Sequence, residues 1–524
     1  MILPFRLALL LAALSGFIAL AQEIIWTRIY NFASGSSAQA LGMLLGSYLI
    51  GLALGSLWSR RWQEGGSGEH PGHSTLARLL VLSNVAAFLV VPAVSWLVVR
   101  WEWPHTLPLV MLAAALMGAA FPLLCHLAIP PDHDTGARLS YLYLANIIGS
   151  GAGSLLTGFV LMEHLPLWQI SALLLLAALV IGIRLQWRAG RPTAGDLGLW
   201  GLTIVLIGLS PSLYHQLYDR LQYKHEYGQR PPFTEVIESR HGVITIEDGR
   251  VIYGNGVYDG MIETDPGKGG GMHRPFFLSA VHAAPREVLM IGLSGGAWAK
   301  IIAHNPAVEK VTAVEINEGY LQLIRNHPVV SDVLTDPKVT VVIDDGRRWL
   351  RRNPGRHFDV IVMNTTFNWR EFSSALLGRE CLELIKTRLK PGGIVMWNCT
   401  GSGRAINTGM TVFPYTLMLA NNCVASTSPL VIDPERWRQI LSSYQLDGRP
   451  VYDLGTTEGR AGLAQMMAIA TDPATFQGNI ITRDKMQARY GHEPIITDDN
   501  LGHEYKFTLK DTARLKNLLL PFLP

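Results

Sequence analysis

The sequence changes character abruptly near its middle. Up to about Pro211 it consists of long apolar runs with few charges, and after Tyr214 acidic and basic residues are dense. A helix that crosses a membrane needs roughly 20 mainly apolar residues. We therefore predict three parts: a helical, polytopic membrane domain over residues 1–214, a linker and β-rich lead-in over 215–285, and a soluble α/β domain over 286–524.

Seven apolar runs approach the length of a membrane span, and the last two are short or interrupted. The first run has Arg6 near its start, as a signal peptide does. Its apolar core is long, however, and Gln22-Glu23 stands where small cleavage-site residues belong, so we expect a retained helix. The runs are Leu3–Gln22, Ala38–Trp58, Leu79–Val99, Leu107–Leu127, Leu142–Met162, Leu167–Ile183 and Leu197–Tyr214.

Small residues and one carboxylate stand out in these runs. Glycines recur in the second and fifth runs, which predicts close helix–helix packing, with a substrate path as the alternative. Glu23 ends the first run; a carboxylate at membrane depth is costly, so Glu23 either serves a function or lies at the interface. The glycines are Gly42, Gly46, Gly51, Gly55, Gly149, Gly151, Gly153 and Gly158.

The basic residues of the apolar half give a conflicting topology. Most of its arginines lie in or beside the second, fourth and sixth connections, and the odd connections offer only Arg28 and Arg100. The positive-inside rule places the even connections in the cytoplasm, so seven crossings would put the soluble domain outside. Because its expected ligand lies inside, we predict a multi-pass protein of the inner (cytoplasmic) membrane with a cytoplasmic soluble domain. The seventh run then lies in the interface, or another crossing is miscounted.

Charge and cysteine content exclude several classes of protein. A formal net charge of +3 gives no reason to expect nucleic acid as a partner. The four cysteines form no Cys-x-x-Cys pair and no Cys/His cluster, so neither a zinc site nor a redox motif is expected. We predict no metal site and no disulfide framework.

Strands and helices alternate through most of the soluble half. A hairpin with an Asp248-Gly249 turn leads in over Phe233–Ile252. This alternation predicts a parallel, doubly wound, Rossmann-like sheet, which binds ligands at the carboxyl ends of its strands. The expected strands are Glu287–Ile291, Lys310–Val314, Val339–Ile343, Phe358–Met363 and Ile394–Trp397, and the expected helices are Ala297–Ala303, Glu318–Asn326, Arg347–Arg352 and Leu376–Leu389.

Chemistry-bearing residues follow three of these strands. A glycine loop allows close backbone approach to a ligand, an acid about 20 residues later can accept from ribose hydroxyls, and a further carboxylate can accept from an adenine amine. The regular G-x-G-x-x-G spacing, a P-loop and a His-Glu-x-x-His motif are absent from the sequence. The candidate nucleoside-binding residues are Gly292, Ser294, Gly295, Gly296, Glu315, Asp344, Asp345 and Gly346.

The soluble half resembles the spermidine synthase family, the polyamine aminopropyltransferases, over about Phe233 to Pro391. The apolar half is similar to the multi-pass version of this family. The segments that carry the resemblance are Val236–Val243, Met272–Arg274, Val288–Gly292, Val311–Asn317, Asp344–Arg347, Ser15–Phe17, Glu23–Arg28, Tyr143–Gly149 and Ile496–Asn500.

The resemblance implies an S-adenosylmethionine-transferase type of domain and assigns roles. The glycine loop would line the methionine side of an adenosyl sulfonium, Glu315 would hold its ribose, and Asp345, with Asp344 beside it, would read its adenine. His273 would lie near the aminopropyl group, although a solvated loop histidine is an equal alternative. No cofactor would be bound permanently, because S-adenosylmethionine or its decarboxylated form is a co-substrate.

One departure from the family concerns the acid that orients or deprotonates the acceptor amine. It usually ends the fourth strand, where this sequence has Asn364, and no carboxylate follows before Glu371. An amide can hydrogen-bond an amine but cannot take its proton. The candidate acceptor-side residues are Asn364, Asn368, His273 and Glu371.

Three functions stay open from the sequence. The first is a membrane-bound aminopropyltransferase-like enzyme that acts on an amine or polyamine and releases methylthioadenosine. The second keeps the adenosyl ligand and changes the chemistry to methyl transfer, elimination or cyclisation. The third is a non-catalytic adenosyl sensor coupled to a transporter-like helical domain. The resemblance also suggests a homodimer, and the apolar half implies the lipid bilayer as a partner.

Overall fold

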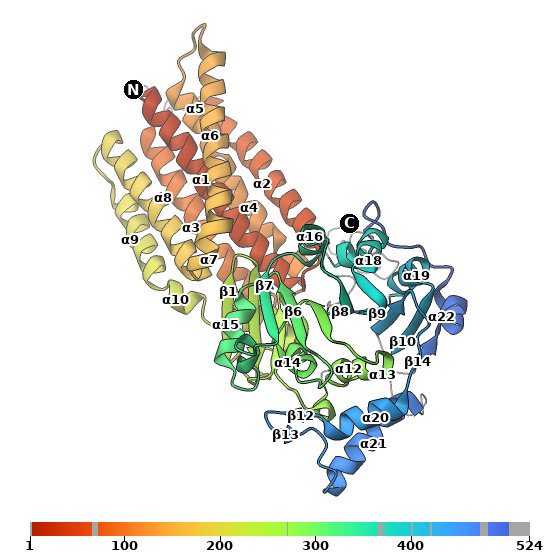
Figure 1. The fold of residues 1–524 in the computed structure, drawn as a ribbon. Helices are drawn as coiled ribbons and strands as arrows, with labels where there is room; N and C mark the ends of the chain where they lie inside the picture. The colour runs from red at the N-terminus through yellow and green to blue at the C-terminus, as the bar shows by residue number, and fades with distance from the viewer. Residues whose placement is uncertain are drawn as a thin grey trace, which may run out of the picture. The chain divides into compact units, whose positions relative to one another are not determined.

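The computed structural model describes residues 3–64, 72–269, 271–364, 370, 373–399, 402–419, 422–471 and 480–501. The chain forms two compact units (Figure 1). Among the described residues, the first comprises 3–233 together with Glu238–Val243, and the second comprises Thr234–Ile237 and 244–501.

The first unit is built from helices alone, apart from the hairpin tip Glu238–Val243. A short π-helical turn, Thr157–Leu161, continues the sixth helix. The helices are α1 (Phe5–Ala33), α2 (Ala38–Glu64), α3 (His73–Leu97), α4 (Leu107–Gly118), α5 (Ala120–Ala128), α6 (Thr135–Leu156), α7 (Met162–His164), α8 (Leu167–Ala189), α9 (Ala194–Gly208), α10 (Ser210–Leu213) and α11 (Leu217–Tyr223).

Six helical stretches of the described chain are long and apolar enough to cross a membrane, and a seventh is counted if a bent pair is one span. That pair, Ala194–Gly208 with Ser210–Glu226, bends by 63° at the seventh predicted run. Two predictions were wrong in detail. The first helix continues to Ala33, so Glu23 lies within it and not at its end. The sixth run is not short, because α8 extends it to 23 residues.

The predicted close packing holds for some of the glycines and fails for others. A Cβ on Gly149 would lie 1.9 Å from the Ala13 carbonyl oxygen of α1, and one on Gly55 would lie 1.8 Å from the Ala115 oxygen of α4. These contacts leave no room for a side chain at the α1–α6 and α2–α4 crossings. Gly51 and Gly153 are packed in the same way, whereas Gly42, Gly46 and Gly151 have open space at the Cβ position.

A carboxylate joins the hairpin tip to the helices of the first unit. Glu238 Oε2 accepts a hydrogen bond of 2.9 Å from the Leu167 amide at the start of α8. The same oxygen lies 3.9 Å from Nη1 of Arg28, whose side chain is 7% exposed. Burial of a lone charge is costly, and here the two opposite charges are buried together.

The second unit contains a four-stranded sheet and a mixed eight-stranded sheet. The small sheet has the order β1-β2-β3-β4, and the large one the order β14-β10-β11-β9-β8-β5-β6-β7. Asp248 and Gly249 both have positive φ in the predicted turn between β2 and β3. The strands are β1 (Glu235–Ser239), β2 (Gly242–Glu247), β3 (Val251–Gly254), β4 (Val257–Met261), β5 (Glu287–Ile291), β6 (Lys310–Glu315), β7 (Val339–Ile343), β8 (Phe358–Met363), β9 (Leu389–Asn398), β10 (Tyr415–Leu419), β11 (Asn422–Ser426), β12 (Gln445–Leu446), β13 (Arg449–Pro450) and β14 (Ile480–Thr482).

Five neighbouring strands of the large sheet, β9-β8-β5-β6-β7, are parallel, as predicted, and β5 among them is covered on both faces. Alternate residues of one strand enter different cores: Val288 and Met290 pack with α14 and α15, and Leu289 and Ile291 with α16 and α18. Such two-sided burial is typical of doubly wound folds. The helices are α12 (His273–Phe276), α13 (Leu278–Val281), α14 (Ala297–Ala303), α15 (Gly319–Asn326), α16 (Gly346–Arg352), α17 (Ser374–Leu377), α18 (Arg379–Lys386), α19 (Gly403–Val412), α20 (Pro434–Ser443), α21 (Thr457–Thr471) and α22 (Arg483–Tyr490).

Two predicted elements differ from the observed ones. The single helix Leu376–Leu389 is wrong: Gly378 is extended and separates α17 from α18, and the next amide, of Arg379, donates to the Ile496 carbonyl. The last predicted strand begins earlier, because Leu389 already pairs with Phe358 across a register shift. Beyond β9 the sheet is antiparallel, through β11, β10 and β14.

Candidate functional site

The predicted glycine loop joins β5 to α14 at the centre of the parallel sheet. Gly292 has a φ of +88° and Gly296, which precedes α14, a φ of +81°. Both angles lie in the left-handed region that favours glycine. A Cβ on Gly292 would also lie 2.9 Å from the Asn364 carbonyl oxygen. The backbone of the loop is therefore packed against the end of β8, at the point where the strand order reverses and such sheets bind ligands.

Glu315 ends the adjacent strand β6, and its carboxylate is tied to this loop. One oxygen accepts from the Leu293 amide at 2.8 Å and from the Ser294 amide at 3.3 Å, and the other accepts from the Asn317 amide at 2.9 Å. Burial raises the pKa of Glu315 above its ordinary value, and these amides partly offset the effect. A carboxylate has about four acceptor positions, so a ribose hydroxyl remains compatible with these bonds.

The Asp-Asp-Gly sequence lies at the end of β7, the next strand outward. Asp345 caps α16, because its Oδ1 accepts from the Arg348 amide at 2.7 Å. Asp344 pairs with the side chain of Arg348 and accepts from the Asp345 amide at 2.8 Å. A Cβ on Gly346 would lie 2.4 Å from the Ile291 side chain. The described hydrogen bonds of Asp345 use Oδ1, so Oδ2 is the oxygen that a ligand amine would meet.

The candidate acceptor-side residues are only partly described. The Asn364 amide donates to the Ile291 carbonyl at 2.9 Å, which places Asn364 beside the glycine loop. Asn368 and Glu371 lie outside the described residues. His273 begins α12, which packs against α14. Burial, together with Arg274, lowers the pKa of His273 from 6.5 to about 4, so this imidazole is neutral at neutral pH.

A buried carboxylate that sequence reasoning missed lies next to the loop. The Asp259 carbonyl in β4 accepts from the Ser294 hydroxyl at 2.8 Å, and its carboxylate accepts from the Tyr320 hydroxyl. Nη1 of Arg370 lies 3.4 Å from the same carboxylate, and Nη2 donates to Gly254. Burial raises the pKa of Asp259, and Arg370 opposes the rise. The sequence gives little indication of this residue, because Asp259 is a single acid in a short strand.

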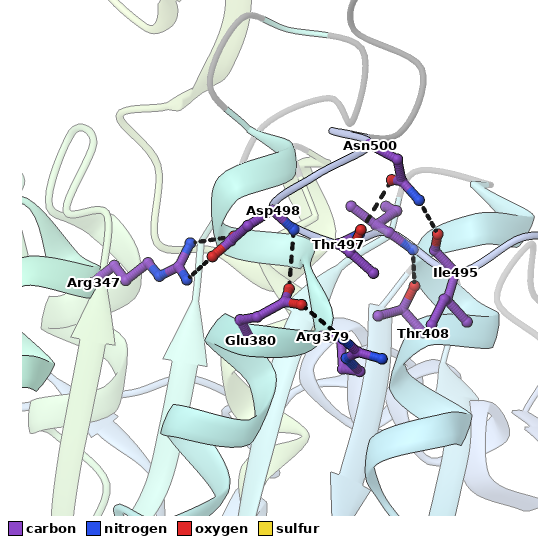
Figure 2. A network of polar contacts seen from close by, with 9 residues as sticks. Arg347, Arg379, Glu380, Thr408, Ile495, Thr497, Asp498 and Asn500 are labelled. Atoms are coloured by element: carbon purple, nitrogen blue, oxygen red, sulfur yellow. Dashed lines mark hydrogen bonds and ion pairs between the residues drawn. The ribbon is translucent and has the colours of Figure 1, made fainter.

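The C-terminal segment is clamped onto the helices beside the Asp-Asp-Gly motif, as Figure 2 shows. Arg347, in the first turn of α16, forms two parallel hydrogen bonds of 2.6 and 2.5 Å with Asp498. The Asp498 amide donates to Glu380 of α18 at 3.0 Å, and the Ile496 amide to the Thr408 hydroxyl of α19 at 2.8 Å. The Ile496–Asn500 motif of the resemblance thus fixes the helix that Asp345 caps.

One group of potential metal ligands occurs among the described residues: His304, Asp332 and Asp447. The Lys300 ammonium lies 3.0 Å from Asp332 and 2.7 Å from Asp447. It supplies the positive charge that these acids require, so the cluster fits a structural ion pair.

The fold and this arrangement define a class of protein: a Rossmann-type α/β domain with a glycine loop and carboxylates at the carboxyl ends of β5, β6 and β7. The family comparison agrees. The description "Spermine/spermidine synthase domain" matches residues 272–402, a stretch that contains the glycine loop, Glu315 and the Asp-Asp-Gly motif. Residues 272–402 of this chain thus match the spermine/spermidine synthase domain, and a helical region precedes them.

Individual relatives carry related names. The chain is 34% identical over 144 residues to spermidine synthase of Dictyostelium discoideum, which covers 27% of this chain and 49% of that protein. It therefore spans about half the length of that relative. It is 24% identical over 403 residues to polyamine aminopropyltransferase 2 of Streptomyces coelicolor, with 71% of this chain and 70% of that protein covered. A crystal structure of spermidine synthase from Thermotoga maritima is 20% identical, covers 44% of this chain and 88% of its own, and has a TM-score of 0.34.

Proposed function

We propose that the chain is a membrane-bound aminopropyltransferase-like enzyme that uses decarboxylated S-adenosylmethionine or S-adenosylmethionine. The observation that carries the proposal is that the family match and the residue cluster lie in the same stretch of the chain. The synthase domain match at residues 272–402 contains the cluster of loop and carboxylates at the carboxyl ends of three neighbouring strands.

The adenosyl donor would bind across those strand ends. The left-handed loop at Gly292–Gly296 allows close approach of the methionine-derived chain, Glu315 would hold the ribose, and Asp345 Oδ2 would accept from the adenine amine. His273 would lie near the transferred group. As a neutral imidazole, it can accept a hydrogen bond or a proton there.

The reaction would be a nucleophilic displacement. The acceptor nitrogen attacks the carbon attached to the sulfonium, the carbon–sulfur bond breaks, and methylthioadenosine leaves with the bonding electrons. The nitrogen must be neutral to attack, so its proton has to go to a base. Asn364 cannot take it. Asp259 supplies a carboxylate beside the loop, and its raised pKa favours proton acceptance.

Six apolar helices support a location in the inner membrane, with the lipid bilayer as a partner. A homodimer is part of the same proposal. The soluble domain would face the cytoplasm, where adenosyl donors are found.

Asn364 also favours a second candidate. This candidate is methyl transfer, or an elimination or cyclisation of S-adenosylmethionine. Without an amine acceptor, no ammonium proton has to be removed before the reaction. The position of Asn364 beside Gly292 fits this chemistry as well as it fits amine binding.

One incubation separates these possibilities. Detergent-purified full-length protein is given each adenosyl donor, alone and with putrescine or spermidine, and the products are analysed by mass spectrometry. Amine-dependent methylthioadenosine and an aminopropylated amine support the transferase. Methylthioadenosine without an acceptor supports elimination or cyclisation, and adenosylhomocysteine supports methyl transfer. If calorimetry detects binding of neither donor, the adenosyl site itself is wrong.

A further inference from the structure

The first unit encloses a cavity of about 260 Å³ between its helices. This volume is close to the lower limit of about 300 Å³ for small-molecule sites. Residues of α1, α2, α3, α4, α5, α6 and α8 line the cavity. Among the described residues of this lining none is charged, yet hydroxyl and amide groups are frequent. The polar members are Ser15, Tyr48, Ser56, Ser83, Asn84, Tyr143, Asn146 and Ser150.

Four of these polar side chains donate a hydrogen bond to a backbone carbonyl. The Ser15 hydroxyl donates to the Ala12 carbonyl at 3.0 Å, and the Ser83 hydroxyl donates to the Leu80 carbonyl at 3.1 Å. The amide nitrogens of Asn84 and Asn146 donate to the same two carbonyls, at 2.8 and 3.1 Å. A carbonyl only accepts, so each asparagine must turn its NH₂ towards it. Each of these groups keeps its oxygen as an acceptor, and each asparagine also keeps one N–H donor.

Two buried atoms of the lining have no hydrogen-bond partner among the described residues. They are Oδ1 of Asn84, a residue that is 5% exposed, and the hydroxyl of Tyr48, which is 2% exposed. A buried polar group without a hydrogen-bond partner destabilises the folded protein. A ligand that donates a hydrogen bond to Asn84 would remove this cost.

The unpartnered Asn84 oxygen, the aromatic rings of the lining and a carboxylate near it together define the chemistry of the ligand. An ammonium group has three donors, one of which can satisfy Asn84 Oδ1. The rings of Tyr48, Phe121 and Tyr143 also line the cavity, and aromatic faces attract cations. Glu23 lies one helical turn beyond Ala19, which lines the cavity, on the same face of α1. A carboxylate is therefore near enough to favour a positive charge.

We propose that this cavity is a binding site for a primary amine, held by Asn84, Tyr48 and the serine and asparagine oxygens around them. The site is separate from the adenosyl site. It is argued from the helical unit alone, so loss of the transferase proposal would leave it standing. The amine can be a free diamine or the headgroup of an aminophospholipid, since both present the same ammonium group.

The test uses full-length protein in nanodiscs of phosphatidylcholine alone. Binding of radiolabelled 1,4-diaminobutane is measured for the wild type, Asn84→Leu, Asn84→Asp and Tyr48→Phe. We expect at least a tenfold loss of affinity in Asn84→Leu and a gain in Asn84→Asp, because a carboxylate strengthens the pairing with an ammonium. Thr203→Val is the matched control: its buried hydroxyl also donates to a backbone carbonyl, in α9, away from the cavity.

Two arms identify the source of the amine. Unlabelled 1,4-butanediol, which has the same length without the amine, should not compete. Native mass spectrometry in mixed lipids then asks whether phosphatidylethanolamine stays on the wild type and leaves Asn84→Leu. Diamine binding that depends on Asn84 supports a free amine, and retained lipid without diamine binding supports the headgroup. Competition by the diol, equal binding to Asn84→Leu and Thr203→Val, or neither amine bound overturns the proposal. If Asn84→Leu does not fold, Tyr48→Phe and Asn84→Asp carry the same comparison.

Discussion

Replacing Gly292 by alanine tests whether the loop conformation is required for the adenosyl site. At a φ of +88°, a residue with a side chain costs about 1–3 kcal/mol. The added Cβ would also lie 2.9 Å from the Asn364 carbonyl oxygen, and such overpacking costs about 1–3 kcal/mol. Because one backbone shift relieves part of both costs, we expect a loss of about 2–4 kcal/mol in local stability.

Hydrogen exchange followed by mass spectrometry measures that loss in the peptides that contain β5 and α14. Exchange protection reports the free energy of local opening, so protection of Gly292→Ala should fall about 30-fold to 700-fold, since 1.4 kcal/mol corresponds to a factor of ten. Gly355→Ala is the control, because Gly355 has open space at its Cβ position and a φ outside the left-handed region. Equal protection and equal S-adenosylmethionine binding in the two variants would refute the reasoning.

Three further substitutions test other parts of the chain. Asp498→Asn should cost about 1 kcal/mol, measured by urea unfolding. Arg347 holds the pKa of Asp498 below its ordinary value. The stabilisation is therefore present above the pKa of an unfolded aspartate and is lost as the pH falls. Equal stability of the wild type and Asp498→Asn at pH 7 would contradict the clamp. The pKa of His273 is about 4, against 6.5 for an ordinary histidine, so up to about 3 kcal/mol of the free energy of unfolding should be lost as the pH falls from 6.5 to 4. His273→Gln should lack this loss. The same dependence of stability on pH in His273→Gln and the wild type would be contrary evidence. Gly153→Val should abolish helix packing, seen as lost monodispersity in detergent, while Gly151→Val, at an open position, should not.

The strands of the parallel sheet could be predicted closely because their sequence carries the necessary information. Glu287–Ile291, Val339–Ile343 and Phe358–Met363 were predicted with the observed bounds. β5 and β8 are mostly buried, and strands buried on both faces are mainly apolar runs. Polar or glycine residues end these runs, as they end the half-exposed edge strand β7. The positions of the loop, Glu315 and Asp344-Asp345 followed from those ends. Their proposed roles toward a ligand stay predictions.

What the sequence did not reveal depends on partners far along the chain. Gly378 breaks a helix that local periodicity favours, because Arg379 pairs with the backbone of Ile496. Asp259 and Arg370 pair across 111 positions, which no short motif encodes. The end of α1 was misplaced because Gln22-Glu23 has the polarity of a helix end, yet Gln22 is fully buried.

The clamp between Arg347 and Asp498 has a consequence for the order in which the protein is made. The two residues are separated by 151 positions. A ribosome adds about 5–20 residues per second, so α16 would wait about 8–30 s for its partner. During this interval the helix that carries Asp345 lacks its outer support, and the late strand β14 has not yet reached the sheet edge. We therefore expect a nascent chain that stops before Asp498 to be the form that chaperones and proteases recognise, even though every residue assigned to the adenosyl ligand has by then been translated.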